Sequence, residues 1–180
     1  MQPTLPAHGV LLELNGVGLY LIGASGIGKS EIALQLINQG ACLICDDAPD
    51  LRADRDSGQV SGHCPEGFYG QMHIHDLGII NITELINTDS FKPVSVINFI
   101  IELVAADDRL TVVSQQTPQQ LLTPDYQHWQ YQHWTIPGIH LHLYPNRNIP
   151  LLIKTAVMQF LFLEQQQSEI TNHQRSLRVR

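Results

Sequence analysis

The 180-residue sequence has little positive charge, few cysteines and no long apolar run. Its 10 basic residues face 17 acidic ones, giving a net charge of −7, so the basic stripe typical of a dedicated nucleic-acid-binding protein is missing. No stretch is long and apolar enough to span a membrane, and no basic segment with a following apolar run marks a signal peptide. We therefore expect a cytoplasmic protein without a nucleic-acid or membrane partner.

The sequence has only three cysteines, Cys42, Cys45 and Cys64. An odd number of cysteines is typical of reduced thiols in the cytoplasm. The spacing Cys42-x-x-Cys45 matches half of a zinc or redox motif, but no second pair completes it. Strand alternation would also place these two thiols on opposite faces. Buried core cysteines are the favoured interpretation.

With 43% hydrophobic and 15% charged residues, the composition is that of a globular protein. The length favours one domain, which we expect to cover residues 1–164. Residues 165–180 are rich in glutamine and form a polar C-terminal tail, interpreted as a frayed helix end.

The most informative motif is a glycine-rich loop, Gly23-Ala24-Ser25-Gly26-Ile27-Gly28-Lys29-Ser30, which matches G-x-x-x-x-G-K-[ST] in full. The glycines let several backbone N–H groups point at phosphate oxygens, Lys29 can reach the β- and γ-phosphates, and the Ser30 hydroxyl can bind Mg²⁺. A plain glycine-rich turn is the alternative. The loop predicts phosphate or nucleotide binding.

The surroundings of the loop favour this interpretation. Residues 19–22 are apolar and predict a buried strand entering the loop, and residues 30–38 predict an amphipathic helix leaving it. Further strands are expected at residues 8–14, 41–45, 94–103 and 139–144, a small hairpin within 50–66, and a closing helix at 150–163. Without regular alternation of strands and helices, the pattern predicts an α/β phosphate-loop domain with a mixed sheet.

Two adjacent carboxylates, Asp46 and Asp47, end the apolar strand that follows the loop helix. Phosphoryl-transfer proteins place acids there, where one can hold Mg²⁺ and the other can accept the proton of an attacking hydroxyl. A turn with a capping side chain is the alternative. Glu102, after another apolar run, is either a second metal-side acid or a satisfied polar residue.

Histidines occur in two pairs with period-two spacing, His73/His75 and His140/His142. Each pair would share one face of a strand, and two adjacent strands could then form a four-histidine metal site. Solvent-facing positions on half-buried strands are the favoured interpretation. His8 precedes Gly9 at the head of the first strand and alone carries little information.

Several of these segments together resemble the catalytic domain of HPr kinase/phosphorylase. The likeness runs in order along nearly the whole chain, through residues 8–12, 23–34, 43–48, 76–81, 108–110, 136–139 and 146–148. The segments Ser25-Gly26-Ile27-Gly28-Lys29-Ser30-Glu31 and Leu77-Gly78-Ile79-Ile80-Asn81 are specific to that family rather than common to phosphate-loop proteins. From the resemblance we expect a protein without the additional N-terminal domain of longer members, similar to the short proteobacterial form.

The resemblance implies a fold like that of phosphoenolpyruvate carboxykinase and a set of functional residues. His8, Lys29, Asp47 and Arg109 match the family's active-site positions, with Asp47 as base toward the substrate serine. Ser30 and Asp46 are then the expected Mg²⁺ ligands. The implied cosubstrate and metal are ATP and Mg²⁺, the implied partner is an HPr-like phosphocarrier protein of the phosphotransferase system, and the implied assembly is a homo-oligomer, typically a hexamer.

One segment departs from the family pattern. The family normally shows Glu-(Ile/Val)-Arg-Gly before Leu77, whereas this chain has His73-Ile74-His75-Asp76. A neutral imidazole is a poor ligand for Mg²⁺, and the loss of an arginine removes a bidentate phosphate contact. Asp76 can replace the lost carboxylate only from a different position along the strand.

Three functional hypotheses follow. The leading one is an ATP- and Mg²⁺-dependent serine kinase, with or without the reverse phosphorylase activity, that acts on a phosphocarrier. The second is a nucleotide-binding sensor that has lost efficient phosphotransfer through the changed segment at residues 73–76. The third is a kinase for a small hydroxylated molecule.

Overall fold

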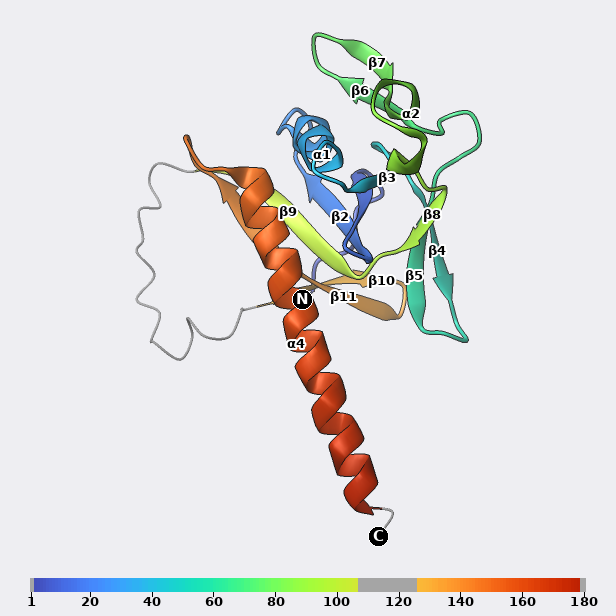
Figure 1. Cartoon of the computed structure of the whole chain (residues 1–180), viewed down its shortest axis with the longest axis vertical. Helices are drawn as coiled ribbons and strands as arrows, with labels where there is room; N and C mark the ends of the chain where they lie inside the picture. The colour runs from blue at the N-terminus through green and yellow to red at the C-terminus, as the bar shows by residue number, and fades with distance from the viewer. Residues whose placement is uncertain (1, 107–125, 179–180) are drawn as a thin grey trace. The chain divides into compact units, whose positions relative to one another are not determined.

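The computed structural model describes residues 2–106 and 126–178, which divide into two compact units, Met1–Arg147 and Asn148–Arg180. The first unit is built on a six-stranded sheet in the order β10-β11-β9-β2-β1-β3 (Figure 1). Its strands are β1 (Val10–Leu14), β2 (Val17–Gly23), β3 (Cys42–Cys45), β9 (Phe99–Ala105), β10 (Gln127–Tyr131) and β11 (Trp134–Leu143). β9 runs parallel to β2 and to β11, and the other pairs are antiparallel. The predicted mixed sheet is confirmed.

The β1–β2 hairpin brings the strand that enters the glycine-rich loop into register with the N-terminal strand. Its two-residue turn, Asn15-Gly16, has positive φ angles of 53° and 79°, the combination a type I′ turn requires. Asparagine and glycine tolerate this conformation best. As a result Val10 lies opposite Leu21, and the segment before β1 reaches the end of the sheet where the loop begins.

The sequence suggested one strand over residues 94–103, and this expectation is wrong. The structure has two strands there, β8 (Val94–Val96) and β9, which belong to different sheets. The break lies at Asn98, whose side-chain oxygen accepts the Gly18 N–H at 2.9 Å and whose own N–H donates to the Gly18 carbonyl at 2.8 Å. Hydrophobicity alone cannot reveal the break, because residues on both sides of it are apolar.

Two smaller sheets complete the first unit. One contains β4 (Asp50–Asp54), β5 (Gln59–His63) and β8, and the other is the hairpin of β6 (Gln71–Ile74) and β7 (Gly78–Asn81). Helix α1 (Lys29–Ile37) contacts β1, β2, β3 and β6, while α2 (Ile82–Leu85) and the 3-10 helix η1 (Thr88–Ser90) follow β7. The small hairpin expected within residues 50–66 is therefore β4–β5.

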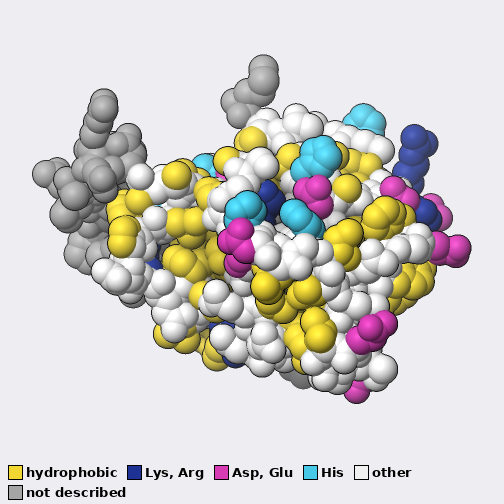
Figure 2. All heavy atoms as spheres, turned by 90° about the horizontal axis from the view of Figure 1, so that it is seen from above, with side chains coloured by type: hydrophobic (Ala, Val, Ile, Leu, Met, Phe, Trp, Pro, Cys, Tyr) yellow, Lys and Arg dark blue, Asp and Glu magenta, His cyan; other side chains and the backbone are white. Residues whose placement is uncertain are grey.

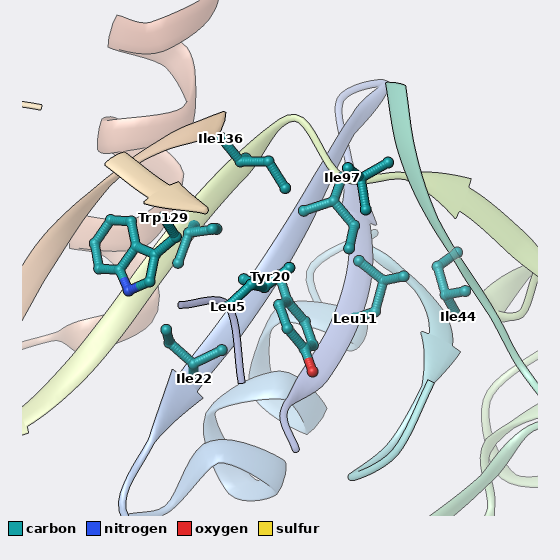
Figure 3. Packing of buried hydrophobic residues seen from close by; sticks show 10 residues of the cluster. Leu5, Leu11, Tyr20, Ile22, Ile44, Ile97, Trp129 and Ile136 are labelled. Atoms are coloured by element: carbon teal, nitrogen blue, oxygen red, sulfur yellow. The ribbon is translucent and has the colours of Figure 1, made fainter. Parts of the chain in front are cut away.

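Apolar side chains cover both faces of the large sheet. Tyr20 and Ile22 of β2 point into the cluster of Figure 3, which also contains Trp129 from β10. Leu19 and Leu21, which alternate with them, are also fully buried, so β2 is a central strand enclosed on both sides. Trp129 is only 2% exposed, and its strand β10 pairs with the start of β11.

The second unit consists of helix α4 (Ile149–Arg178). It starts within one residue of the expected closing helix but continues through most of the glutamine-rich tail, because glutamine, glutamate and leucine favour helix. Ile153, Val157 and Phe160 follow one another at the spacing of one helical face. No helix within residues 2–106 and 126–178 contains a segment long and apolar enough to cross a bilayer.

Candidate functional site

The glycine-rich loop joins the end of β2 to α1, as the sequence predicts. Gly26 and Gly28 have φ angles of 72° and 94°, a region that other residues enter only with strain. Gly23 is needed for close packing as well, since a Cβ there would lie 2.6 Å from the Leu103 carbonyl oxygen of β9. These three glycines allow the chain to turn back on itself directly in front of the α1 N-terminus, where phosphate binds favourably.

Lys29 is the first residue of α1, and its side chain folds back over the loop. The ammonium group donates to the carbonyl oxygens of Gly23 and Ala24, both at 3.1 Å. Carbonyl oxygens are the nearest acceptors the loop itself offers to this charge. A bound phosphate would supply stronger, charged acceptors at the same place.

Asp46 is held between the loop helix and the β6–β7 hairpin. One carboxylate oxygen accepts from the Ser30 hydroxyl at 2.9 Å, and the other accepts from the His73 backbone N–H at 2.8 Å. Burial raises the pKa of Asp46 above its ordinary value, although both hydrogen bonds act in the opposite direction. The Ser30 and Asp46 side chains are thus fixed next to one another, with their oxygens at the mouth of the loop.

Asp47 differs sharply from its neighbour. Its side chain is 76% exposed, and its carboxylate lies 4.0 Å from Nδ1 of His8, which is 77% exposed. The backbone of Asp47 has a φ angle of 70°, and its carbonyl accepts the Gly9 N–H at 2.9 Å. The hydrogen bond with Gly9 therefore holds the segment preceding β1 against the end of β3. The Asp47 carboxylate itself lies exposed at the rim of the site.

A cavity of about 570 Å³ joins these groups. Its wall contains Val10, residues 25–31 of the loop and α1, Asp46, Asp47, His73 and His75. The volume is in the range of sites for small molecules, about 300–1,000 Å³. Figure 2 views the end of the molecule that carries α1 and the β6–β7 hairpin, and it shows histidine and acidic side chains gathered there. The structure thus brings together the loop, both aspartates and the divergent His73–His75 segment.

Other residues highlighted by the sequence lie elsewhere. Glu102 is 3.1 Å from His140 Nε2 across the β9–β11 pair and does not border the cavity. Asp76 lies in the β6–β7 turn, 89% exposed and 3.6 Å from the His75 ring, also outside the cavity wall. Asp76 therefore does not take the place of a carboxylate at position 73. Arg109 lies outside the described residues.

The four-histidine metal site is not formed. His73 belongs to the two-stranded sheet, whereas His140 and His142 belong to β11 of the large sheet. Among the described residues, no group of three or more histidine, cysteine or acidic side chains is arranged to hold a metal ion. His73, His75 and His140 are exposed, as expected for solvent-facing positions, and His142 is half-buried.

Sequence reasoning did not anticipate two features of the site. It did not assign the His73 backbone N–H to Asp46, because main-chain donors leave no trace in a residue pattern. It also missed the left-handed backbone of Asp47, although aspartate is among the residues that tolerate this conformation.

Comparisons with known proteins give consistent matches for this chain. Residues 1–176 match the family model described as the HPr Serine kinase C-terminal domain. The chain is 32% identical over 160 residues to the HPr kinase/phosphorylase of Brevibacillus brevis, covering 89% of this chain and 49% of that protein. It is 34% identical over 164 residues to the protein of the same name from Leptospira biflexa, covering 88% and 47%. The chain spans about half the length of these curated relatives.

A solved structure extends the likeness to three dimensions. The structure of the Hpr(Ser) kinase/phosphatase from Coxiella burnetii superposes with a TM-score of 0.78 at 30% sequence identity. The match covers 92% of this chain and 95% of that one.

Proposed function

Because this chain belongs to the family of the HPr serine kinase C-terminal domain, we propose that it transfers the γ-phosphoryl group of ATP to a serine hydroxyl of an HPr-like phosphocarrier protein. The observation that carries the proposal is that the loop, Ser30, Asp46 and Asp47 border one and the same cavity. The names of the relatives, HPr kinase/phosphorylase, support the same reaction and its reversal. A cytoplasmic homo-oligomer, hexameric as the family resemblance implies, is part of the proposal.

In this proposal the loop holds the phosphates of ATP. The backbone N–H groups of residues 24–28 surround the phosphate oxygens, and the Lys29 ammonium exchanges its two carbonyl acceptors for β- and γ-phosphate oxygens. The α1 N-terminus adds partial positive charge at the same point. Each of these contacts strengthens as negative charge builds up on the leaving β-phosphate oxygen.

The residues present fit Mg²⁺, which prefers oxygen ligands and keeps several of its waters. Ser30 Oγ and Asp46 Oδ1 lie 2.9 Å apart and supply a hydroxyl and a carboxylate. When bound, the metal neutralises charge on the β- and γ-phosphate oxygens. The second Asp46 oxygen stays on the His73 N–H, which fixes the orientation of the carboxylate.

Asp47 is the proposed base. Its carboxylate is not committed to a hydrogen bond in the described structure and stands at the rim, where a protein substrate can present its serine. The serine oxygen attacks the γ-phosphorus while its proton moves to Asp47, and the bond to the β-phosphate oxygen breaks to release ADP. His8 Nδ1 lies 4.0 Å from the Asp47 carboxylate and can orient it. On the resemblance alone, Arg109 is assigned a charge-stabilising role.

A second candidate function is nucleotide sensing with weak phosphotransfer. The observation that favours it is the position of His73 and His75 in the cavity wall, where the family has a glutamate and an arginine. If this candidate is correct, ATP binds in a Lys29-dependent manner with little turnover. The double variant His73→Glu/His75→Arg then raises turnover, whereas the kinase hypothesis predicts efficient turnover without it.

Intact-mass measurement tests the leading proposal. The chain is incubated with Mg-ATP and purified phosphocarriers, with the Lys29→Ala variant as a matched control and each carrier with its candidate serines replaced by alanine as a second control. A gain of one phosphoryl group, dependent on Lys29 and on the serine, is expected. Unmodified carriers, or equal modification with the Lys29→Ala variant, would contradict the proposal.

A further inference from the structure

The N-terminal strap, residues 5–9, precedes β1 and is anchored at both of its ends. Leu5 is 5% exposed, and its N–H donates to the Gln130 carbonyl oxygen of β10 at 2.8 Å. Gly9 is also buried, and its N–H donates to the Asp47 carbonyl oxygen at 2.9 Å. The three residues between these anchors are exposed. The strap thus joins β10 to the end of β3 at the rim of the phosphate site.

His8 depends on the backbone of the strap for its position. Its side chain is 77% exposed, so few neighbouring atoms restrain the ring directly. Nδ1 nevertheless lies 4.0 Å from the Asp47 carboxylate. A functional side chain keeps such an arrangement only where the structure around it is rigid. The anchor at Gly9 supplies this rigidity on one side of His8, and the other side needs a restraint of its own.

Tyr20 of β2 supplies the restraint on that other side. Its hydroxyl donates to the Pro6 carbonyl oxygen at 3.2 Å. The Tyr20 side chain is 0% exposed and belongs to the cluster of Figure 3, in which Leu5 and Leu11 lie on either side of its ring. Because the ring is enclosed in the core, the hydroxyl that meets the strap is held in a fixed place.

The same ring also limits the space at Gly9. A Cβ on Gly9 would lie 2.7 Å from the Tyr20 ring and 2.6 Å from the Leu21 carbonyl oxygen, both closer than real Cβ contacts. The bare backbone of Gly9 therefore packs directly against the tyrosine. Tyr20 thus contacts the strap on both sides of His8, at Pro6 through its hydroxyl and at Gly9 through its ring.

We propose that Tyr20 is a positioning residue for the candidate active site: its hydroxyl and ring hold the N-terminal strap so that the His8 imidazole stays beside the Asp47 carboxylate. Tyr20 does not border the phosphate cavity, so it acts through His8 rather than on the nucleotide. Its effect on phosphotransfer rests on the proposed function. Its effect on the strap does not, and it can be measured without nucleotide.

Tyr131 of β10 offers a matched control. Its hydroxyl donates to the Leu51 carbonyl oxygen at 2.9 Å, again in a partly buried place, and Tyr131 does not border the phosphate cavity. Tyr20→Phe and Tyr131→Phe each remove one hydroxyl-to-carbonyl hydrogen bond and keep the aromatic ring. A general loss of stability should therefore be similar in the two variants, whereas loosening of the strap should occur in Tyr20→Phe alone.

The first test is amide hydrogen exchange of the full chain, measured by NMR without nucleotide. The Gly9 amide should exchange at least about fivefold faster in Tyr20→Phe than in the wild type, because local opening of the strap exposes its N–H. In Tyr131→Phe the Gly9 rate should be unchanged. The Asn98 amide, which donates to Gly18 at the start of β2 at 2.8 Å, is the internal reference and should be unchanged in both variants.

Gly9 exchange at the wild-type rate in Tyr20→Phe would overturn the proposal. Equal acceleration of the Gly9 and Asn98 amides would overturn it as well, since the variant would then loosen β2 in general rather than the strap.

The second test is single-turnover phosphorylation of a carrier, combined with Mg-ATP titration. Tyr20→Phe should lower the rate at least about fivefold, because a displaced His8 no longer orients Asp47. Affinity for Mg-ATP should stay within about twofold of the wild type, and Tyr131→Phe should match the wild type in both quantities. In a His8→Ala background, Tyr20→Phe should cause no further loss of rate, because the residue through which it acts is gone.

Equal fold-losses in the His8 and His8→Ala backgrounds would overturn the positioning role, since Tyr20 would then act independently of His8. A wild type that phosphorylates no carrier would contradict the proposed function instead. The Gly9 exchange rate would in that case still decide whether Tyr20 holds the strap.

Discussion

Replacing Asp47 by asparagine separates catalysis from nucleotide binding. Asparagine keeps the size of the side chain and tolerates the left-handed backbone at φ 70°, whereas alanine at this position adds strain of about 1–2 kcal/mol. The Gly9 N–H still reaches the backbone carbonyl of residue 47, so the local fold is retained. The change removes the proton acceptor together with its negative charge.

We expect a large change in the rate of phosphotransfer and a small one in the affinity for Mg-ATP. Loss of a positioned general base lowers the rate of phosphotransfer by about 10²- to 10⁴-fold. Because the Asp47 side chain is 76% exposed, water screens its repulsion of phosphate to about 1 kcal/mol or less. Affinity for Mg-ATP should therefore stay unchanged or increase by no more than about fivefold.

The assay combines single-turnover phosphorylation of a carrier with titration of a fluorescent ATP analogue. Asp56→Asn, an exposed acid in the β4–β5 turn, serves as the matched control and should change neither quantity. Retention of turnover within tenfold refutes the role of Asp47 as base. Parallel loss of affinity and turnover would instead make Asp47 a binding residue.

Two further predictions concern stability and pH. Gly18→Ala should lower the free energy of unfolding by about 2–4 kcal/mol, because its Cβ would lie 1.6 Å from the Val96 carbonyl oxygen. Gly16→Ala has open space around its Cβ and should cost only about 1–2 kcal/mol, the strain of its left-handed backbone. Urea denaturation measures both changes. In metal-free protein the raised pKa of Asp46 means that the folded state holds its proton more tightly, so its contribution to stability falls as pH rises from 3.8 through the folded pKa. Thermal unfolding of Asp46→Asn should lack that decline, and identical pH profiles would contradict the assignment.

The parts of the fold that the sequence predicts well are those in which local chemistry dictates local structure. The loop between β2 and α1 follows from its glycines, and the β1–β2 turn follows from Asn15-Gly16 with positive φ at both residues. The end of β3 follows from Asp46-Asp47 after an apolar run. In each case a few adjacent residues contain the whole signal.

The parts that the sequence does not predict depend on contacts between distant residues. The division of residues 94–105 into β8 and β9 is set by Asn98 meeting Gly18, 80 positions away. The different surroundings of Asp46 and Asp47 arise because Ser30 and the His73 backbone reach only the first. Glu102 illustrates the same limit, since its pairing with His140 becomes visible only when β9 and β11 lie side by side.

The measurement that tests the central proposal most directly is the location of phosphate on an HPr-like carrier after a timed reaction with this chain and Mg-ATP. Tandem mass spectrometry should find one phosphoserine whose formation requires Lys29 and slows by about 10²- to 10⁴-fold in the Asp47→Asn variant. ATP binding without any phosphoserine, while His73→Glu/His75→Arg restores it, would contradict the kinase proposal and establish the chain as a nucleotide sensor.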